Sequence, residues 1–212
     1  MLPAGLQVAG SRKEITLSKL LLVEGNDAFQ LFKALVRHLD LLGEIEIRNY
    51  GGVTHLADYL EALPVVSGWA GVTQLGIVRD AEQRSVDSAF QSVCRGLQNA
   101  GLSVPAKPKE AAGQTPSVSV FVLPDCSAPG MLETLLLQTV ADDPAWSCVK
   151  GYFECLQAQS DELPHSLEKA KLQVFLASRP EYVAHLGEAA HKGYWPWDNP
   201  VLDELKRFLL AL

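Results

Sequence analysis

The chain has 212 residues, of which 48% are hydrophobic and 20% are charged, a balance typical of a globular protein. Its net charge of −7 argues against a protein that holds a polynucleotide tightly by itself, because neutralisation of phosphates by basic residues supplies most of such affinity. No apolar run reaches the roughly 20 residues that cross a bilayer, and the first residues resemble no secretory signal. We therefore expect a cytoplasmic protein that does not act at a membrane.

Apolar runs of strand length alternate with stripes of helical spacing along the first two thirds of the chain. Strands are expected at about 17–23, 45–47, 72–79 and 118–123. Helices are expected around 31–42, 53–63, 86–97 and 131–140. This alternation predicts an α/β fold with parallel strands and helices on both faces of the sheet.

Several residues mark where the expected elements begin and end. Ser85 is a plausible N-cap of the third helix, and Gly43 is placed to end the first. The Pro- and Gly-containing segment 104–116 is typical of an irregular loop. Beyond about residue 141 we find only helical periodicity, with Asn199-Pro200 as a strong start signal for the last helix.

The four cysteines are informative mainly because their spacing argues against one kind of metal site. Their spacing contains no C-x-x-C pair, which argues against a zinc site and favours reduced thiols. Cys148 and Cys155 lie seven residues apart, on one face of a helix, where we expect a packing role.

Acidic residues follow two of the buried strands. Glu24 and Asp27 come after the first strand, and Asp80 and Glu82 come after the third. If these strands are neighbours, about 4.8 Å apart, their terminal acids converge at the carboxyl edge of the sheet, where open parallel sheets bind ligands. Carboxylate oxygens suit the hard cations Mg²⁺ and Mn²⁺. The alternative is that these acids only cap the helices that follow.

These motifs resemble the Toprim domain, the metal-binding module of topoisomerases, primases, recombination-repair proteins and OLD-family nucleases. The resemblance rests on Val23-Glu24-Gly25 and on Asp80-Ala81-Glu82. Segments 76–81, 129–133 and 187–195 are also similar to a small stand-alone bacterial Toprim family of unknown function. The resemblance implies a Toprim-like, Rossmann-like sheet of about four parallel strands at 15–140. Residues 141–212 would form a helical extension packed on this domain.

The resemblance also implies roles for single residues. Glu24 would be the general acid/base or a first metal ligand, while Asp80 and Glu82 would hold the cation. Glu133 is similar to a late acidic ligand of OLD-like members, although it can equally be a solvated helix residue. Two departures favour one metal over two. Ala28 stands where relatives carry an acid, leaving Asp27 one residue early, and Glu82 replaces an aspartate.

Basic and aromatic residues near the C-terminus suggest contacts with nucleic acid. Lys192 lies in a segment with Trp195 and Trp197, a mixture that can stack bases and neutralise phosphates. The alternative is that the tryptophans anchor the tail to the sheet. Lys169, Lys171 and Arg179 lie on one expected helix, where they form a solvated face or stabilise transition-state charge. Among them, Lys171 is the candidate nucleic-acid contact.

Arg79 directly precedes Asp80, and strand alternation turns its side chain away from its neighbours. For this arginine we expect an ion pair rather than catalysis.

Three functional hypotheses follow. The first is a Mg²⁺- or Mn²⁺-dependent Toprim nuclease acting on nucleic acid, in which Glu24 transfers a proton. The second is a non-catalytic effector subunit that docks on a larger partner such as an ATPase. The third is a receiver-like regulator, disfavoured by Glu82 and by the lack of a lysine directly after the fourth strand. The first hypothesis requires that Glu24 and Asp80 face a common space with room for a cation.

Overall fold

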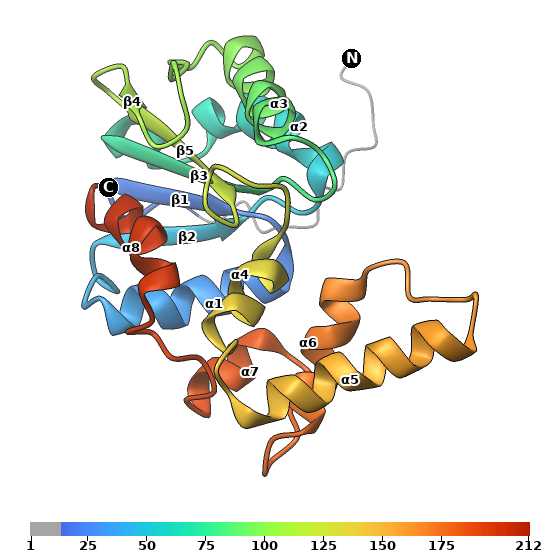
Figure 1. Ribbon diagram of the computed structural model, residues 1–212. Coiled ribbons are helices and arrows are strands. Elements are labelled where there is room, and N and C mark those ends of the chain that lie inside the picture. Colours follow the sequence, from blue (N-terminus) through green and yellow to red (C-terminus); the bar gives the residue numbers. More distant parts are fainter. Residues whose placement is uncertain (1–13) are drawn as a thin grey trace, which may run out of the picture.

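A computed structural model of the protein describes residues 14–212 and shows a five-stranded, mostly parallel sheet covered by helices on both faces (Figure 1). The parallel strands are β1 (Lys19–Val23), β2 (Ile45–Asn49), β3 (Gln74–Asp80) and β5 (Ser117–Leu123). The strand order is β2-β1-β3-β5-β4. Because β2 lies on one side of β1 and β3 on the other, the direction of winding reverses between β1 and β3. The α/β fold that the sequence predicts is confirmed.

Two hydrophobic clusters fill the space on either side of the sheet, which explains why the parallel strands β1, β3 and β5 are largely apolar. One cluster packs α1 (Gly25–His38), α4 (Leu132–Thr139) and α8 (Asp203–Leu210) against one face. The other packs α2 (Leu56–Ala62) and α3 (Val86–Asn99) against the opposite face (Figure 1). Alternate apolar residues of β1, β3 and β5 therefore belong to different clusters.

Two capping predictions are confirmed. The Ser85 hydroxyl accepts a hydrogen bond from the backbone N–H of Ser88, 3.2 Å away, at the start of α3. The Asn199 side chain accepts one from the N–H of Val201 at 3.0 Å and begins the last helical segment. That segment opens with a 3₁₀ turn, η4 (Pro200–Leu202), which leads directly into α8.

Other boundaries differ from the expectation. The segment expected as a loop contains a fifth strand, β4 (Ala111–Ala112), which pairs antiparallel with β5. Helix α1 ends at His38 rather than at Gly43, because Asp40 adopts a left-handed backbone and its N–H returns to the carbonyl of Arg37. The helix expected near 53–63 is shorter, since 3₁₀ turns η1 (Val53–His55) and η2 (Leu63–Val65) flank α2. A further 3₁₀ turn, η3 (Trp69–Gly71), precedes β3.

The C-terminal third consists of helices that share a core with the sheet. Helices α5 (Pro144–Gln159) and α6 (Leu167–Ala177) project from the sheet below α4, and α7 (Leu186–His191) packs on α1 (Figure 1). Trp195 is 2% exposed, donates its indole N–H to the carbonyl of Leu186 and stacks against Phe175. These two contacts lie within the C-terminal helices, and Trp195 belongs to the hydrophobic cluster that these helices share with the sheet.

None of the helices in the described part of the chain combines the length and apolar character that a bilayer crossing requires.

Candidate functional site

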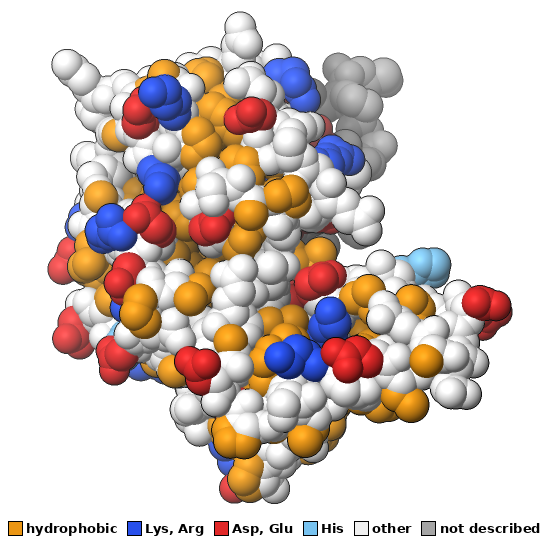
Figure 2. All heavy atoms as spheres, viewed as in Figure 1, with side chains coloured by type: hydrophobic (Ala, Val, Ile, Leu, Met, Phe, Trp, Pro, Cys, Tyr) orange, Lys and Arg blue, Asp and Glu red, His pale blue; other side chains and the backbone are white. Residues whose placement is uncertain are grey.

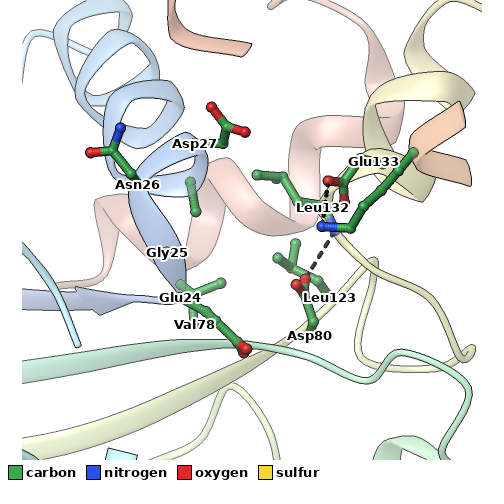
Figure 3. A pocket seen from close by; sticks show the side chains of 11 residues that line it. Glu24, Gly25, Asn26, Asp27, Val78, Asp80, Leu123, Leu132 and Glu133 are labelled. Carbon is green, nitrogen blue, oxygen red and sulfur yellow. Dashed lines mark hydrogen bonds and ion pairs between the residues drawn. The ribbon is translucent and has the colours of Figure 1, made fainter. Parts of the chain in front are cut away.

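A small cavity of about 150 Å³ lies at the carboxyl ends of β1 and β3, where the direction of winding reverses. Its walls include the side chains of Glu24, Asp27, Asp80, Glu133 and Lys169 (Figure 3). We call this cavity the acidic pocket. Four parts of the fold supply its charges: the β1–α1 junction, the end of β3 and the facing helices α4 and α6. The convergence of Glu24 and Asp80 on one space agrees with the expectation from the two strand ends.

Glu24 immediately follows β1, and its carboxylate is held by two buried side chains. Its Oε2 accepts a hydrogen bond from the Tyr50 hydroxyl at 3.2 Å and lies 3.7 Å from Nη1 of Arg79. Burial raises the pKa of Glu24, whereas the Arg79 charge and the Tyr50 hydrogen bond oppose that rise. In Figure 3 this carboxylate points away from Asp27. The ion pair expected for Arg79 is therefore present.

The backbone beside Glu24 turns sharply into α1. Gly25 has a φ of +83°, a left-handed conformation that favours glycine. Its N–H donates to Oδ1 of Asn49 at 2.9 Å, and the same oxygen accepts from the N–H of Gly51 at 2.7 Å. Asn49 thus ties the end of β1 to the end of β2 and positions Glu24. Neither Asn49 nor Tyr50 stands out in the sequence; the only signal is that they lie at the end of a strand.

Asp80 is the carboxylate at the centre of the acidic pocket. Its Oδ1 accepts a hydrogen bond from the backbone N–H of Leu132 at 2.9 Å, at the start of α4 (Figure 3). The pKa of Asp80 is raised to about 7, mainly by burial and further by the negative charges of Glu24 and Glu133. A cation bound in the pocket would therefore favour the ionised form of Asp80.

Glu133 and Lys169 form the opposite wall. Glu133 is only 7% exposed, and its Oε1 lies 3.1 Å from the ammonium of Lys169 on α6. Burial disfavours the charged ammonium, but Glu133, Asp80 and Asp27 together raise the pKa of Lys169. Lys169 therefore faces the pocket rather than forming only a solvated helix face. Figure 2 shows acidic and basic side chains side by side at this junction between the sheet and the projecting helices.

Two of the expected ligands are not directed at the centre of the pocket. Asp27 lines its rim, half-exposed, with Oδ1 3.5 Å from Nδ1 of His185. Glu82 adopts a left-handed backbone with φ 56°, and its N–H donates to the carbonyl of Gly130 at 2.6 Å. This turn places Glu82 in a neighbouring groove, so the Asp-x-Glu spacing does not bring its two acids together.

That groove has a volume of about 930 Å³ and lies between the loop after β3 and the loop before α6. Arg84, Met131 and His165 line it together with Glu82 and Glu168. It shares a wall with the acidic pocket, because Met131 and Glu168 face the groove while the next residues in the sequence, Leu132 and Lys169, face the pocket.

The two candidate nucleic-acid contacts lie in different surroundings. Lys171 lines a third cavity of about 230 Å³, together with Trp146. Lys192 pairs with Glu181. The structure does not unite these lysines in one basic surface.

The donor chemistry of the acidic pocket fits a hard cation, but its side chains are not arranged as a ligand shell. Within residues 14–212, no three His, Cys, Asp or Glu side chains group closely enough to hold a metal ion as they lie. Glu24 is turned toward Tyr50 and Arg79, and Glu133 toward Lys169. Cation binding by all three acids would therefore require Glu24 and Glu133 to exchange these partners.

Comparisons with known proteins identify a family and a related fold. The crystal structure of hypothetical protein PH0156 from Pyrococcus horikoshii OT3 is similar, with a TM-score of 0.57 and 16% sequence identity. The similarity covers 92% of this chain and 95% of that one, and at this identity it bears on the fold alone. No curated protein matches the chain. The model of a family described as "Protein of unknown function (DUF3226)" matches residues 18–212, so the chain belongs to this family.

Proposed function

We propose that this protein is a Toprim-type phosphodiesterase, a nuclease that depends on Mg²⁺ or Mn²⁺ and acts on nucleic acid. The observation that carries the proposal is the convergence of Glu24 and Asp80 on one cavity where the strand winding reverses. The sequence resemblance to Toprim domains rests on motifs that contain these two residues and supports the same interpretation. Neither the description of the family nor the name of the similar structure states an activity.

Asp80 and Glu24 would hold the cation, with Glu133 as a third oxygen donor. Carboxylates are the ligands that Mg²⁺ and Mn²⁺ prefer, and the elevated pKa of Asp80 reflects its burial and the neighbouring negative charges of Glu24 and Glu133. When bound, such a cation supplies charge neutralisation on the phosphate and an acidified water. Asp27, on the rim, is close enough to the pocket to bind through a water.

The remaining groups have roles that the chain itself defines. Glu24 would accept or donate the proton, since its burial already raises its pKa above that of an exposed glutamate. Lys169 would neutralise negative charge on the reacting phosphate. The adjoining groove, with the guanidinium of Arg84 and the ring of His165, would hold the substrate beside the pocket.

The second candidate is a non-catalytic effector that docks on a larger partner such as an ATPase. One observation favours it: Arg79 and Lys169 already pair with Glu24 and Glu133, so two of the acids are neutralised without a cation. In this case the pocket would be a structural remnant, and partner binding would take place elsewhere on the surface.

Cation binding and cleavage can be tested separately. We expect Mn²⁺ to bind the purified protein in calorimetric titration and to raise its Tm by mass action, whereas Asp80→Asn should abolish both effects. Supercoiled and single-stranded DNA should be cut only with Mg²⁺ or Mn²⁺, and Glu24→Gln should reduce the rate at least a hundredfold.

Glu154→Gln is the matched control, because Glu154 is exposed on α5 and distant in the fold from the strand ends. Its cleavage rate should equal that of the wild type. Absence of Mn²⁺ binding at millimolar concentration would contradict the proposal. Cation binding without cleavage, together with a stably co-purifying protein, would support the effector function instead.

A further inference from the structure

Glu24 is held by two of the most deeply buried polar side chains in the described part of the chain. Tyr50 and Arg79 are each 2% exposed, and both approach the same oxygen, Oε2 of Glu24. Neither residue lines the acidic pocket, so neither is placed to touch a substrate there. Their contacts with Glu24 therefore suggest that they act through it.

The Tyr50 hydroxyl has two acceptors for its single proton. Its oxygen lies 3.2 Å from Oε2 of Glu24 and equally 3.2 Å from the carbonyl oxygen of Val78 in β3. A buried hydroxyl that loses its acceptor is costly, but here a second acceptor is already in place. Glu24 can therefore move away while the Tyr50 hydroxyl keeps a hydrogen-bond acceptor.

Arg79, in contrast, opposes the release of Glu24. Its Nε is buried without a hydrogen-bond partner, and Glu24 at 3.7 Å is its ion-pair partner among residues 14–212. A buried guanidinium in this state favours any arrangement that keeps the Glu24 charge nearby. Arg79 and Tyr50 thus hold the Glu24 carboxylate in a position from which its charge still acts on Asp80.

We propose that Tyr50 and Arg79 are positioning residues that keep Glu24 in a resting position, and that a divalent cation bound at Asp80 draws Glu24 out of it. As Glu24 turns toward Asp80, the Tyr50 hydroxyl transfers its hydrogen bond to the Val78 carbonyl. The inference rests on the proposed cation site. It adds that Tyr50 and Arg79 compete with the cation for the Glu24 carboxylate. The apparent association constant for the cation is the intrinsic constant multiplied by the fraction of molecules in which Glu24 is released.

Removing the hydroxyl should therefore strengthen cation binding. In Tyr50→Phe, we expect the Kd for Mn²⁺, measured by calorimetry and by electron paramagnetic resonance of free Mn²⁺, to fall about three- to tenfold. Tyr59→Phe is the matched control, since Tyr59 packs partly buried against the same hydrophobic cluster without bonding Glu24. Its Kd should equal that of the wild type.

The outcomes separate the two proposals. If wild type and Tyr50→Phe both bind Mn²⁺ with equal affinity, or the variant binds more weakly, the positioning role is overturned while the cation site stands. If neither binds, the cation site fails and the inference with it.

A second measurement does not depend on the variant folding. In a crystal structure of the wild type soaked with Mn²⁺, Glu24 should lie beyond hydrogen-bonding distance of Tyr50, and the Tyr50 hydroxyl should bond Val78. A cation at Asp80 with Glu24 still bonded to Tyr50 would contradict the proposal.

Discussion

At the scale of single residues, the charge of Asp80 determines how the acidic pocket responds to pH. Its folded-state pKa of about 7 lies above the value of 3.8 for an exposed aspartate, because burial penalises the ionised form. As pH rises from about 4 to 7, the unfolded chain releases this proton before the folded protein does. The contribution of Asp80 to stability is therefore full at acidic pH and is lost as pH rises through 7.

Asp80→Asn should remove this pH dependence. Asparagine keeps an oxygen for the Leu132 N–H but cannot ionise, so we expect the variant to be more stable than the wild type at pH 8, by roughly 1–4 kcal/mol. The gain should shrink toward zero at pH 4, as followed by Tm or urea unfolding without divalent cations. Exposed Asp142→Asn should show no such trend. A pH-independent difference between Asp80→Asn and wild type would mean that Asp80 ionises normally.

At the scale of elements, close approach of helices explains a glycine that carries no chemistry. Helices α1 and α7 pack together, and a Cβ added at Gly187 would lie 2.4 Å from Cβ of Gln30. The atoms nearest to this added Cβ are the Cβ and backbone atoms of Gln30 in α1 rather than the far end of a flexible side chain, so they cannot move aside easily.

We expect Gly187→Ala to lower the free energy of unfolding by about 1–3 kcal/mol, because it overpacks this contact. Gly151 is the internal comparison, since it lies in α5 with open space around its would-be Cβ. Gly151→Ala should stabilise by roughly 0.5–1 kcal/mol through helix propensity alone. Chemical denaturation measures both, and equal effects of the two substitutions would argue against a tight α1–α7 interface.

The order of strands and helices could be predicted from the sequence because hydrophobic periodicity is local. The convergence of Glu24 and Asp80 could be predicted, since parallel strands end at one edge. Other features depend on contacts that no local pattern encodes. The left-handed turn that removes Glu82 from the pocket depends on its bridge to Gly130, and Lys169 reaches Glu133 only because α6 folds back onto α4. The two-residue strand β4 has no hydrophobic pattern of its own and exists only by pairing with β5.

At the scale of the whole molecule, one hydrophobic cluster joins the sheet to the C-terminal helices. Phe208 of α8 packs on Phe121 of β5 with ring centroids 5.3 Å apart, and Leu212 lies over Gly76 in β3. The expected boundary near residue 140 therefore divides the sequence without dividing the core.

We accordingly expect a fragment of residues 15–140 not to fold by itself, because one face of its sheet would lose the helices that cover it. Its amide NMR spectrum should be poorly dispersed and its thermal unfolding non-cooperative. The full-length protein should unfold in a single calorimetric transition. A fragment with native-like dispersion and a sharp transition would establish 15–140 as an independent domain.

The placement of α6 has a mechanical consequence. Consecutive residues of this helix, Glu168 and Lys169, face the groove and the acidic pocket respectively, and the Ser166 hydroxyl contacts Sδ of Met131 at 3.8 Å across the same wall. Any shift of α6 away from α4 would widen the groove and withdraw the Lys169 ammonium in one movement. A movement of α6 that admits a bulky molecule to the groove would therefore also leave the Glu133 carboxylate without its Lys169 partner.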